Sequence, residues 1–235
     1  MKPETLVVVS GPVDPRDWWE PLTADLLAAD LPITAPRDAC EQAPYGIAWI
    51  ASIARVLHSS SLDSPLVIAG HGTAGPLLPA LAGTQQVAGR HVGGYVFVDA
   101  TLPRPGPTSH LDLLQAAAPD EGEAAHEHLH QPGATWPLPP ALPDTPGNTP
   151  GADGQHGEMH ARPRDHDFWT ETLPPATDWP DAPCAYVQTG QAAPGCGDIA
   201  FWARSAQARG WTVIDDTHNA DLGRAIRAAV EALPG

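Results

Sequence analysis

The sequence contains a single lysine and only three cysteines in 235 residues. Cys40, Cys184 and Cys196 are scattered without CxxC spacing, so neither a disulfide framework nor a zinc site is expected. The 28 acidic residues outnumber the 12 basic ones, and a net charge of −16 repels a nucleic acid backbone. No basic-then-apolar segment precedes the first predicted strand, and no apolar run approaches the length of a membrane span. We therefore expect a cytoplasmic protein without a nucleic acid or membrane partner.

A phosphate-binding glycine loop is also lacking. The small-residue segment 70–75 has neither the lysine of a P-loop nor GxGxxG spacing, so we expect no cofactor. This segment does follow an apolar run at 66–69 and precedes a predicted helix at 76–82. A strand that enters a tight turn and then a helix is the context of a nucleophile elbow, Gly-x-Ser-x-Gly. Gly72 stands where that pattern requires the serine.

Strands and helices alternate along the rest of the chain. Apolar and β-branched runs predict strands at 5–10, 33–35, 66–69, 94–99, 184–188 and 211–214. Helical spacing of apolar residues predicts helices at 19–29, 45–58, 76–82, 198–209 and 220–233. This alternation predicts an α/β fold with a mostly parallel central sheet and helices on both faces.

The pattern stops between residues 101 and 183, which hold 16 of the 28 prolines and seven of the 11 histidines. Only short helices are predicted there, near 110–118 and 167–172. An insert of this length is usually a lid, a binding loop or a disordered segment. We therefore divide the chain into a core of residues 1–102 and 183–235 and a lid or cap insertion at 103–182.

The histidines of the insert have spacings that occur in metal sites. His126, His128 and His130 alternate, and His156 and His160 are four residues apart, which places ligands on one face. The residues around them are rich in proline, glycine and acids. Since such a composition favours a solvated loop, we expect no metal.

The order of these segments resembles the α/β-hydrolase superfamily over essentially the whole chain. In that superfamily a loop after an early strand supplies an oxyanion donor, the elbow follows, a later strand ends in an acid, and a histidine lies near the C-terminus. The resemblance assigns Ser10 to the oxyanion loop, Gly72 to the nucleophile position, Asp99 to the acid and His218 to the histidine. Asp198, which follows the strand at 184–188, is the alternative acid.

The departures from the family pattern decide the predicted chemistry. Because Gly72 has no side chain, it cannot form an acyl-enzyme. The amide of Thr73 corresponds to one oxyanion donor, whereas Pro12 at the other position has no N–H, which leaves Val13 as a candidate if the register shifts by one. The oxyanion hole is therefore predicted to retain at best one of its two donors.

A possible dyad remains, in which a carboxylate orients His218 as a general base. Asp99 is the preferred partner, and Asp198, Asp215 and Asp216 compete with it. The opposite interpretation, in which His218 and Asp99 only cap their loops, has about the same weight.

The missing side chain also leaves space at the elbow. His71 and Thr73 flank this space, although packing of His71 and N-capping by Thr73 are the simpler roles. Trp18, Trp19 and Trp169 lie in the oxyanion loop and the lid, where aromatic residues commonly line an apolar pocket.

We therefore predict a non-hydrolytic acid–base enzyme acting on an apolar, oxygenated small molecule of polyketide-type secondary metabolism. His218 would remove a proton α to a carbonyl and the Thr73 amide would stabilise the enolate, with elimination narrowly favoured over decarboxylation or cyclisation. The superfamily contains similar cases: plant methylketone synthases with alanine at the elbow decarboxylate, and related proteins of bacterial polyketide pathways eliminate. A non-catalytic ligand-binding pseudohydrolase and a hydrolase with His218-activated water are the alternatives.

Overall fold

The computed structural model describes residues 3–15, 19, 26, 31–38, 42–138, 161–177, 179–191, 193–218 and 221–234. A six-stranded sheet in the order β2-β1-β3-β4-β5-β6 forms its centre, and every neighbouring pair is parallel. The strands are β1 (Thr5–Val9), β2 (Ile33–Thr34), β3 (Leu66–His71), β4 (Val92–Val98), β5 (Cys184–Gln188) and β6 (Thr212–Asp215). The predicted α/β class with a parallel sheet is confirmed.

Helices cover both faces of the sheet, as predicted. They are α2 (Tyr45–Ser59), the 3-10 helix η1 (Gly72–Leu77), α3 (Leu78–Val87), α4 (His110–Ala117), α5 (Pro119–Leu129), α6 (His166–Thr170), α7 (Ile199–Ala208) and α8 (Leu222–Ala232). Successive strand residues point to opposite faces, so Val7 and Ile68 pack with α2, α3 and α7, whereas Val8 and Val96 pack with α8. The strands are therefore apolar on both sides, which explains their continuous apolar sequences.

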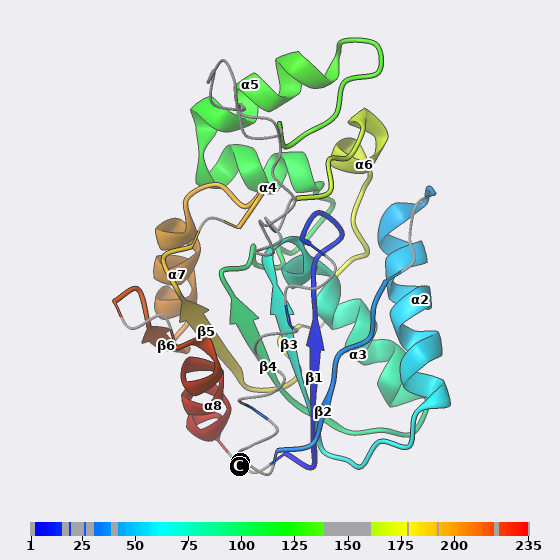
Figure 1. The fold of residues 1–235 in the computed structure, drawn as a ribbon, viewed down its shortest axis with the longest axis vertical. Helices are drawn as coiled ribbons and strands as arrows, with labels where there is room; N and C mark the ends of the chain where they lie inside the picture. Colours follow the sequence, from blue (N-terminus) through cyan, green and yellow to red (C-terminus); the bar gives the residue numbers. More distant parts are fainter. Residues whose placement is uncertain are drawn as a thin grey trace, which may run out of the picture.

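The carboxyl ends of the parallel strands meet at one edge of the sheet, and α4, α5 and α6 lie beyond that edge (Figure 1). These helices fall within the predicted insertion at 103–182. They share an apolar cluster that includes Leu114, Leu129 and Trp169 and that also takes in Val13 from the loop after β1. Helices α4, α5 and α6 thus share an apolar cluster with the loop that the resemblance assigns to the oxyanion site.

Helix α5 was not predicted. Its sequence is rich in acids and histidines, and its buried face consists of Gly122, Ala125 and Leu129. These residues give too weak an apolar periodicity to predict a helix. The predicted helix at 19–29 lies outside the described residues except for Trp19 and Leu26, which are both buried. Among the described residues, no helix combines the length and apolar character needed to cross a membrane.

Candidate functional site

Gly72 lies in a tight turn between strand β3 and the helical segment η1. β3 ends at His71, and Gly72 begins η1 with a φ of 58°, in the left-handed region that glycine adopts readily. The amide of Thr101 donates to the carbonyl oxygen of Gly72 at 3.2 Å, which holds the turn against the segment after β4. The strand–turn–helix context expected from the sequence is therefore present.

The carboxylate of Asp14 occupies the space above Gly72. A Cβ atom added to Gly72 would lie 2.5 Å from Oδ1 and 2.8 Å from Oδ2 of Asp14. These separations are shorter than any van der Waals contact, so a side chain at position 72 and this carboxylate exclude each other. The loop after β1 thus places an acid where the family pattern has the nucleophile.

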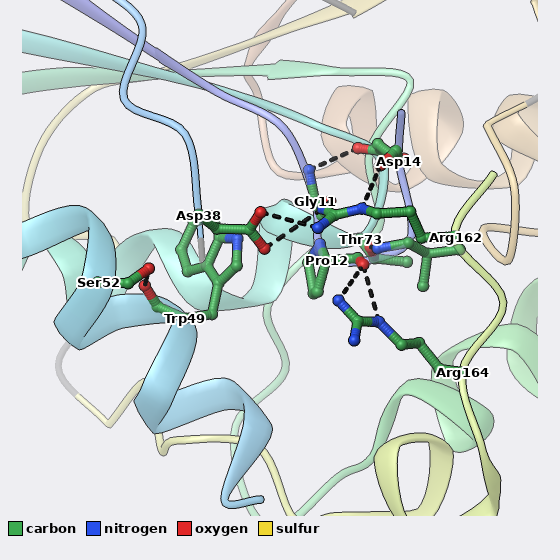
Figure 2. Close-up of polar contacts among 10 residues, drawn as sticks. Gly11, Pro12, Asp14, Asp38, Trp49, Ser52, Thr73, Arg162 and Arg164 are labelled. Atoms are coloured by element: carbon green, nitrogen blue, oxygen red, sulfur yellow. Dashed lines mark hydrogen bonds and ion pairs between the residues drawn. The ribbon is translucent and has the colours of Figure 1, made fainter. Parts of the chain in front are cut away.

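Asp14 is held by two donors. The amide of Gly11 donates to Oδ2 at 2.6 Å, and His71 Nδ1 lies 2.9 Å from the same oxygen. Figure 2 shows the contact of Gly11 with Asp14 at the tip of this loop. Both Asp14 and His71 are buried, and the ring of Trp19 meets the His71 ring edge-on at 6.5 Å. Oδ1 of Asp14 has no hydrogen-bond partner within the described part of the chain.

One of the two expected oxyanion donors, the Val13 amide, already has an acceptor within the turn. The Val13 amide donates to Oγ1 of Thr73 at 3.4 Å. Gly11 packs so closely on the turn that a Cβ there would lie 2.8 Å from the Thr73 amide nitrogen. The carboxylate of Asp14 also lies at this turn, and its negative charge would repel a developing oxyanion there. The role of the Thr73 and Val13 amides as oxyanion donors stays a prediction.

Two arginines of the cap side fix the loop after β1 (Figure 2). Arg162 donates through Nε to the Asp14 carbonyl at 2.8 Å and through Nη2 to the Gly11 carbonyl at 2.9 Å, and it pairs with Asp38 at 2.8 Å. Arg164 donates twice to the Pro12 carbonyl, at 3.0 and 2.9 Å. The backbone that presents Asp14 is therefore anchored from outside the core.

Asp99 lies at the end of β4 and hydrogen-bonds with Thr189. Its φ is 43°, and its two carboxylate oxygens accept from the amide of Thr189 at 2.9 Å and from the Thr189 hydroxyl. Burial raises the pKa of Asp99, while the Thr189 hydrogen bonds and the charge of His71 act in the opposite direction. Within the described residues the hydrogen bonds to the Asp99 carboxylate come from Thr189, and the pairing of Asp99 with His218 stays a prediction.

His218 is exposed in the turn after β6. The pKa of Asp215 is lowered mainly by two hydrogen bonds from Thr217. The charge of the neighbouring His218 makes a smaller contribution in the same direction. Asp216 accepts from the Asp221 amide and pairs with Arg224 instead. The catalytic role of His218 stays a prediction.

Asp198, the alternative acid, has other partners, and the thiol of Cys196 is buried. Asp198 caps the N-terminus of α7 by accepting from the Ala200 amide at 2.9 Å, and it pairs with Arg204 at 3.3 Å. Cys196 is buried, and burial followed by the charge of Asp14 raises the pKa of its thiol well above the usual range. A thiol that stays protonated is a poor nucleophile.

The remaining predicted residues are placed as follows. Ser10 lies at the end of β1 with its buried hydroxyl unpartnered among the described residues. Trp169 is fully buried in the cap and donates from Nε1 to the Trp136 carbonyl at 3.0 Å. Trp18 and the histidines at 156 and 160 lie outside the described residues. Within the described ranges, His126, His128 and His130 belong to no group of three or more side chains that can hold a metal.

Asp14 is the site residue that sequence reasoning missed. Ser10 and Val13 of the same loop were considered, but an acid four residues beyond Ser10 has no established place in the family pattern. The available signal was the pairing of a glycine elbow with an acid in the loop after the first strand, because both segments end at the same sheet edge.

No protein-family model matches the chain, and no curated protein matches it. Solved structures do. An extracellular α/β-hydrolase from a Paenibacillus species, reported to share structural and functional homology with tobacco salicylic acid binding protein 2, is 20% identical with a TM-score of 0.71, covering 99% of this chain and 100% of that one. A pyrethroid hydrolase from Sphingobium faniae JZ-2 is 16% identical with a TM-score of 0.62, covering 97% of each chain. A methylesterase from Arabidopsis is 14% identical with a TM-score of 0.55, covering 97% of this chain and 99% of that one. The chain therefore adopts the α/β-hydrolase fold.

Proposed function

We propose that this chain is a non-hydrolytic acid–base enzyme, a lyase acting on an apolar, oxygenated small molecule, with Asp14 as its base. The observation that carries the proposal is the position of the Asp14 carboxylate, which fills the space of the missing nucleophile and leaves Oδ1 without a partner. A carboxylate oxygen that accepts no hydrogen bond has its lone pairs available to take a proton from a substrate.

His71 and the Gly11 amide bind Oδ2 and so direct Oδ1 toward the substrate. In an elimination, Oδ1 takes a proton from the carbon next to a carbonyl, and the electron pair of that C–H bond forms the new double bond. The carbon–oxygen bond on the next carbon breaks, and Asp14 returns its proton to the departing hydroxyl. Water leaves, and the carboxylate is regenerated without a covalent intermediate.

Hydrolysis through an acyl-enzyme has no support in this arrangement. Gly72 supplies no nucleophile, and the carboxylate of Asp14 would repel the oxyanion of a tetrahedral intermediate. The esterases among the structural neighbours thus share the fold, while the residues at this elbow favour a different reaction.

His218 is the competing base, and it would act with or without a carboxylate partner. Decarboxylation and cyclisation use the same base and remain within the proposal as alternative outcomes. A ligand-binding protein without turnover is the contrasting interpretation. In that case the hydrogen bonds from Arg162 to the carbonyls of Asp14 and Gly11 only stabilise the loop after β1.

The test compares small-molecule extracts of the producing organism carrying Asp14→Asn, His218→Ala or the exposed control Asp63→Asn, after each purified variant has been shown to fold by circular dichroism. A precursor that accumulates in the Asp14→Asn strain and not in the control supports the proposal, and a mass excess of one water identifies elimination. Accumulation only in the His218→Ala strain would transfer the role of base to His218. Unchanged extracts in both strains would contradict catalysis.

A further inference from the structure

A hollow in the surface lies apart from Asp14. Its volume is about 400 Å³, and its walls include Pro103, Pro105, Trp179, Arg209 and Trp211. This volume is within the range of small-molecule sites. Asp14, His71 and Gly72 are not among its lining residues, so this hollow is distinct from the turn at Gly72.

Two tryptophans form its apolar wall. The rings of Trp179 and Trp211 meet edge to face with centroids 5.3 Å apart, and Trp211 stacks on the buried Phe97 at 5.4 Å. Because Phe97 belongs to β4, the sheet fixes the orientation of both indoles. Ordered ring faces of this kind bind planar apolar groups with little loss of side-chain entropy.

Arg209 supplies a charge to this wall. Its guanidinium lies 5.7 Å from the Trp179 ring centroid and 5.3 Å from that of Trp211, and Nη2 donates weakly to the Pro103 carbonyl at 3.4 Å. Within the described chain, Arg209 pairs with no carboxylate. Burial lowers its pKa, the nearby Cys184 raises it and the charge of Arg104 lowers it. Because a guanidinium stays protonated in proteins, Arg209 carries a positive charge at this wall.

Arg104 adds a second cation in the same region. Its guanidinium lies 5.8 Å from the Trp202 ring, and it forms no ion pair with any described residue. Adjacent arginines without acids are notable in a chain with 28 acidic and 12 basic residues. By comparison, Arg162, Arg204 and Arg224 each pair with an aspartate.

The other polar group of the wall is also a donor. Nε1 of Trp179 is buried and has no acceptor within the described residues. The nearest acid on this side, Asp181, borders an adjoining hollow and already accepts from Tyr95 Oη at 2.8 Å and Gln86 Nε2 at 2.7 Å. The hollow therefore presents a guanidinium and a buried indole N–H, and none of the described residues that line it is acidic.

We propose that this hollow binds a small organic anion, namely a planar apolar ring system that carries a carboxylate. The ring packs on Trp179 and Trp211, and the carboxylate accepts from Arg209, with Arg104 adding long-range attraction. This proposal is independent of the reaction at Asp14.

The test uses 1-naphthoate as the probe and the uncharged 1-naphthamide as its matched analogue. Binding is followed by calorimetry and by the indole N–H signals in a ¹H–¹⁵N spectrum of the full chain. We expect 1-naphthoate to bind with a submillimolar Kd, to shift the indole signals of Trp179 and Trp211, and to bind at least ten times more tightly than the amide. The variant Arg209→Gln should lose at least tenfold in affinity.

Arg204→Gln on helix α7 is the control, because Arg204 is exposed and lies outside the hollow. Should Arg209→Gln fail to fold, Arg104→Gln removes a charge without altering the packing of the two indoles, and it should weaken naphthoate binding severalfold. Equal affinity for acid and amide, unchanged affinity in both arginine variants, or binding that leaves both indole signals unshifted would overturn the proposal.

Discussion

A Cβ atom on Gly72 would lie 2.5 Å from Oδ1 of Asp14, so these two positions cannot both carry their usual kind of side chain. The absence of a side chain at position 72 and the position of the Asp14 carboxylate therefore depend on each other. Asp14 is anchored by its own loop through Gly11, and Arg162 fixes the backbone of that loop. Restoring a nucleophile to this elbow thus requires the removal of Asp14.

Gly72→Ser should destabilise the protein, because the φ of 58° costs a non-glycine residue about 1–2 kcal/mol and the side chain collides with Asp14. In an Asp14→Gly background the collision is absent, so the added cost of Gly72→Ser should be smaller by about 1–3 kcal/mol. Urea unfolding of the four members of this cycle measures the coupling. Additive free energies of unfolding would show that the carboxylate does not occupy the nucleophile space.

Removal of the His71 side chain should leave a buried carboxylate without one of its two donors. We expect His71→Ala to lower the free energy of unfolding by about 3–5 kcal/mol, the usual range for breaking a buried pair from one side. His58→Ala on the exposed face of α2 is the control and should change it little. A loss below about 1 kcal/mol for His71→Ala would contradict the buried Asp14–His71 pair.

Asp99 should make the protein less stable as pH rises. Burial raises its folded pKa above the ordinary value near 3.8, so the folded state binds the proton more tightly than the unfolded state. Stability from this group is full at low pH and falls as pH rises through the interval above about 3.8, by at most about 1.4 kcal/mol per pH unit.

The measurement for Asp99 is urea unfolding of the native protein and Asp99→Asn between pH 4 and 7. Asparagine keeps the shape, accepts the φ of 43° and has no charge to bury, so its stability relative to the native protein should increase with pH. Asp63→Asn, in an exposed loop, should show no such trend. A difference that is constant with pH would refute the raised pKa.

His110 should make the protein less stable as pH falls. It is buried in the cap, both ring nitrogens lack partners among the described residues, and its ring stacks on Phe168 at 4.9 Å. Burial lowers its pKa from 6.5 to about 3, so the folded state binds fewer protons and stability is lost as pH falls below 6.5.

Replacement of His110 by phenylalanine keeps the stacking and removes the proton. The variant His110→Phe should gain stability relative to the native protein as pH falls, reaching roughly 2 kcal/mol at pH 5. Thermal unfolding at pH 5 and pH 7 measures this gain, and His58→Phe serves as the exposed control. An equal gain at both pH values would mean that His110 is protonated as readily in the folded chain as in the unfolded one.

The sequence predicted those features that depend on local periodicity. Continuous apolar runs identified β1, β3, β4 and β5, and the strand–turn–helix pattern located the elbow at Gly72. The strands are apolar without interruption because both faces of a parallel sheet are buried, so they can be recognised in the sequence. The helix α5 could not be recognised in this way, because its buried stripe is made of small residues.

The partners within the site could not be predicted in the same way. Asp14 and His71 are 57 residues apart, and their contact depends on how the loop after β1 folds back over the elbow. Asp99 was expected to orient His218, but the nearby Thr189 satisfies its carboxylate from the end of β5. The order of segments in the superfamily predicts where a residue lies along the chain. Its hydrogen-bond partners depend on which donors the tertiary structure brings close to it.

The most direct test of the central claim is the extract comparison between the Asp14→Asn strain and its parent. A base at Asp14 predicts that a precursor one water heavier than the normal product accumulates in the variant, while the Asp63→Asn strain matches the parent. An Asp14→Asn protein that folds and leaves the extract unchanged would contradict the assignment of Asp14 as the base.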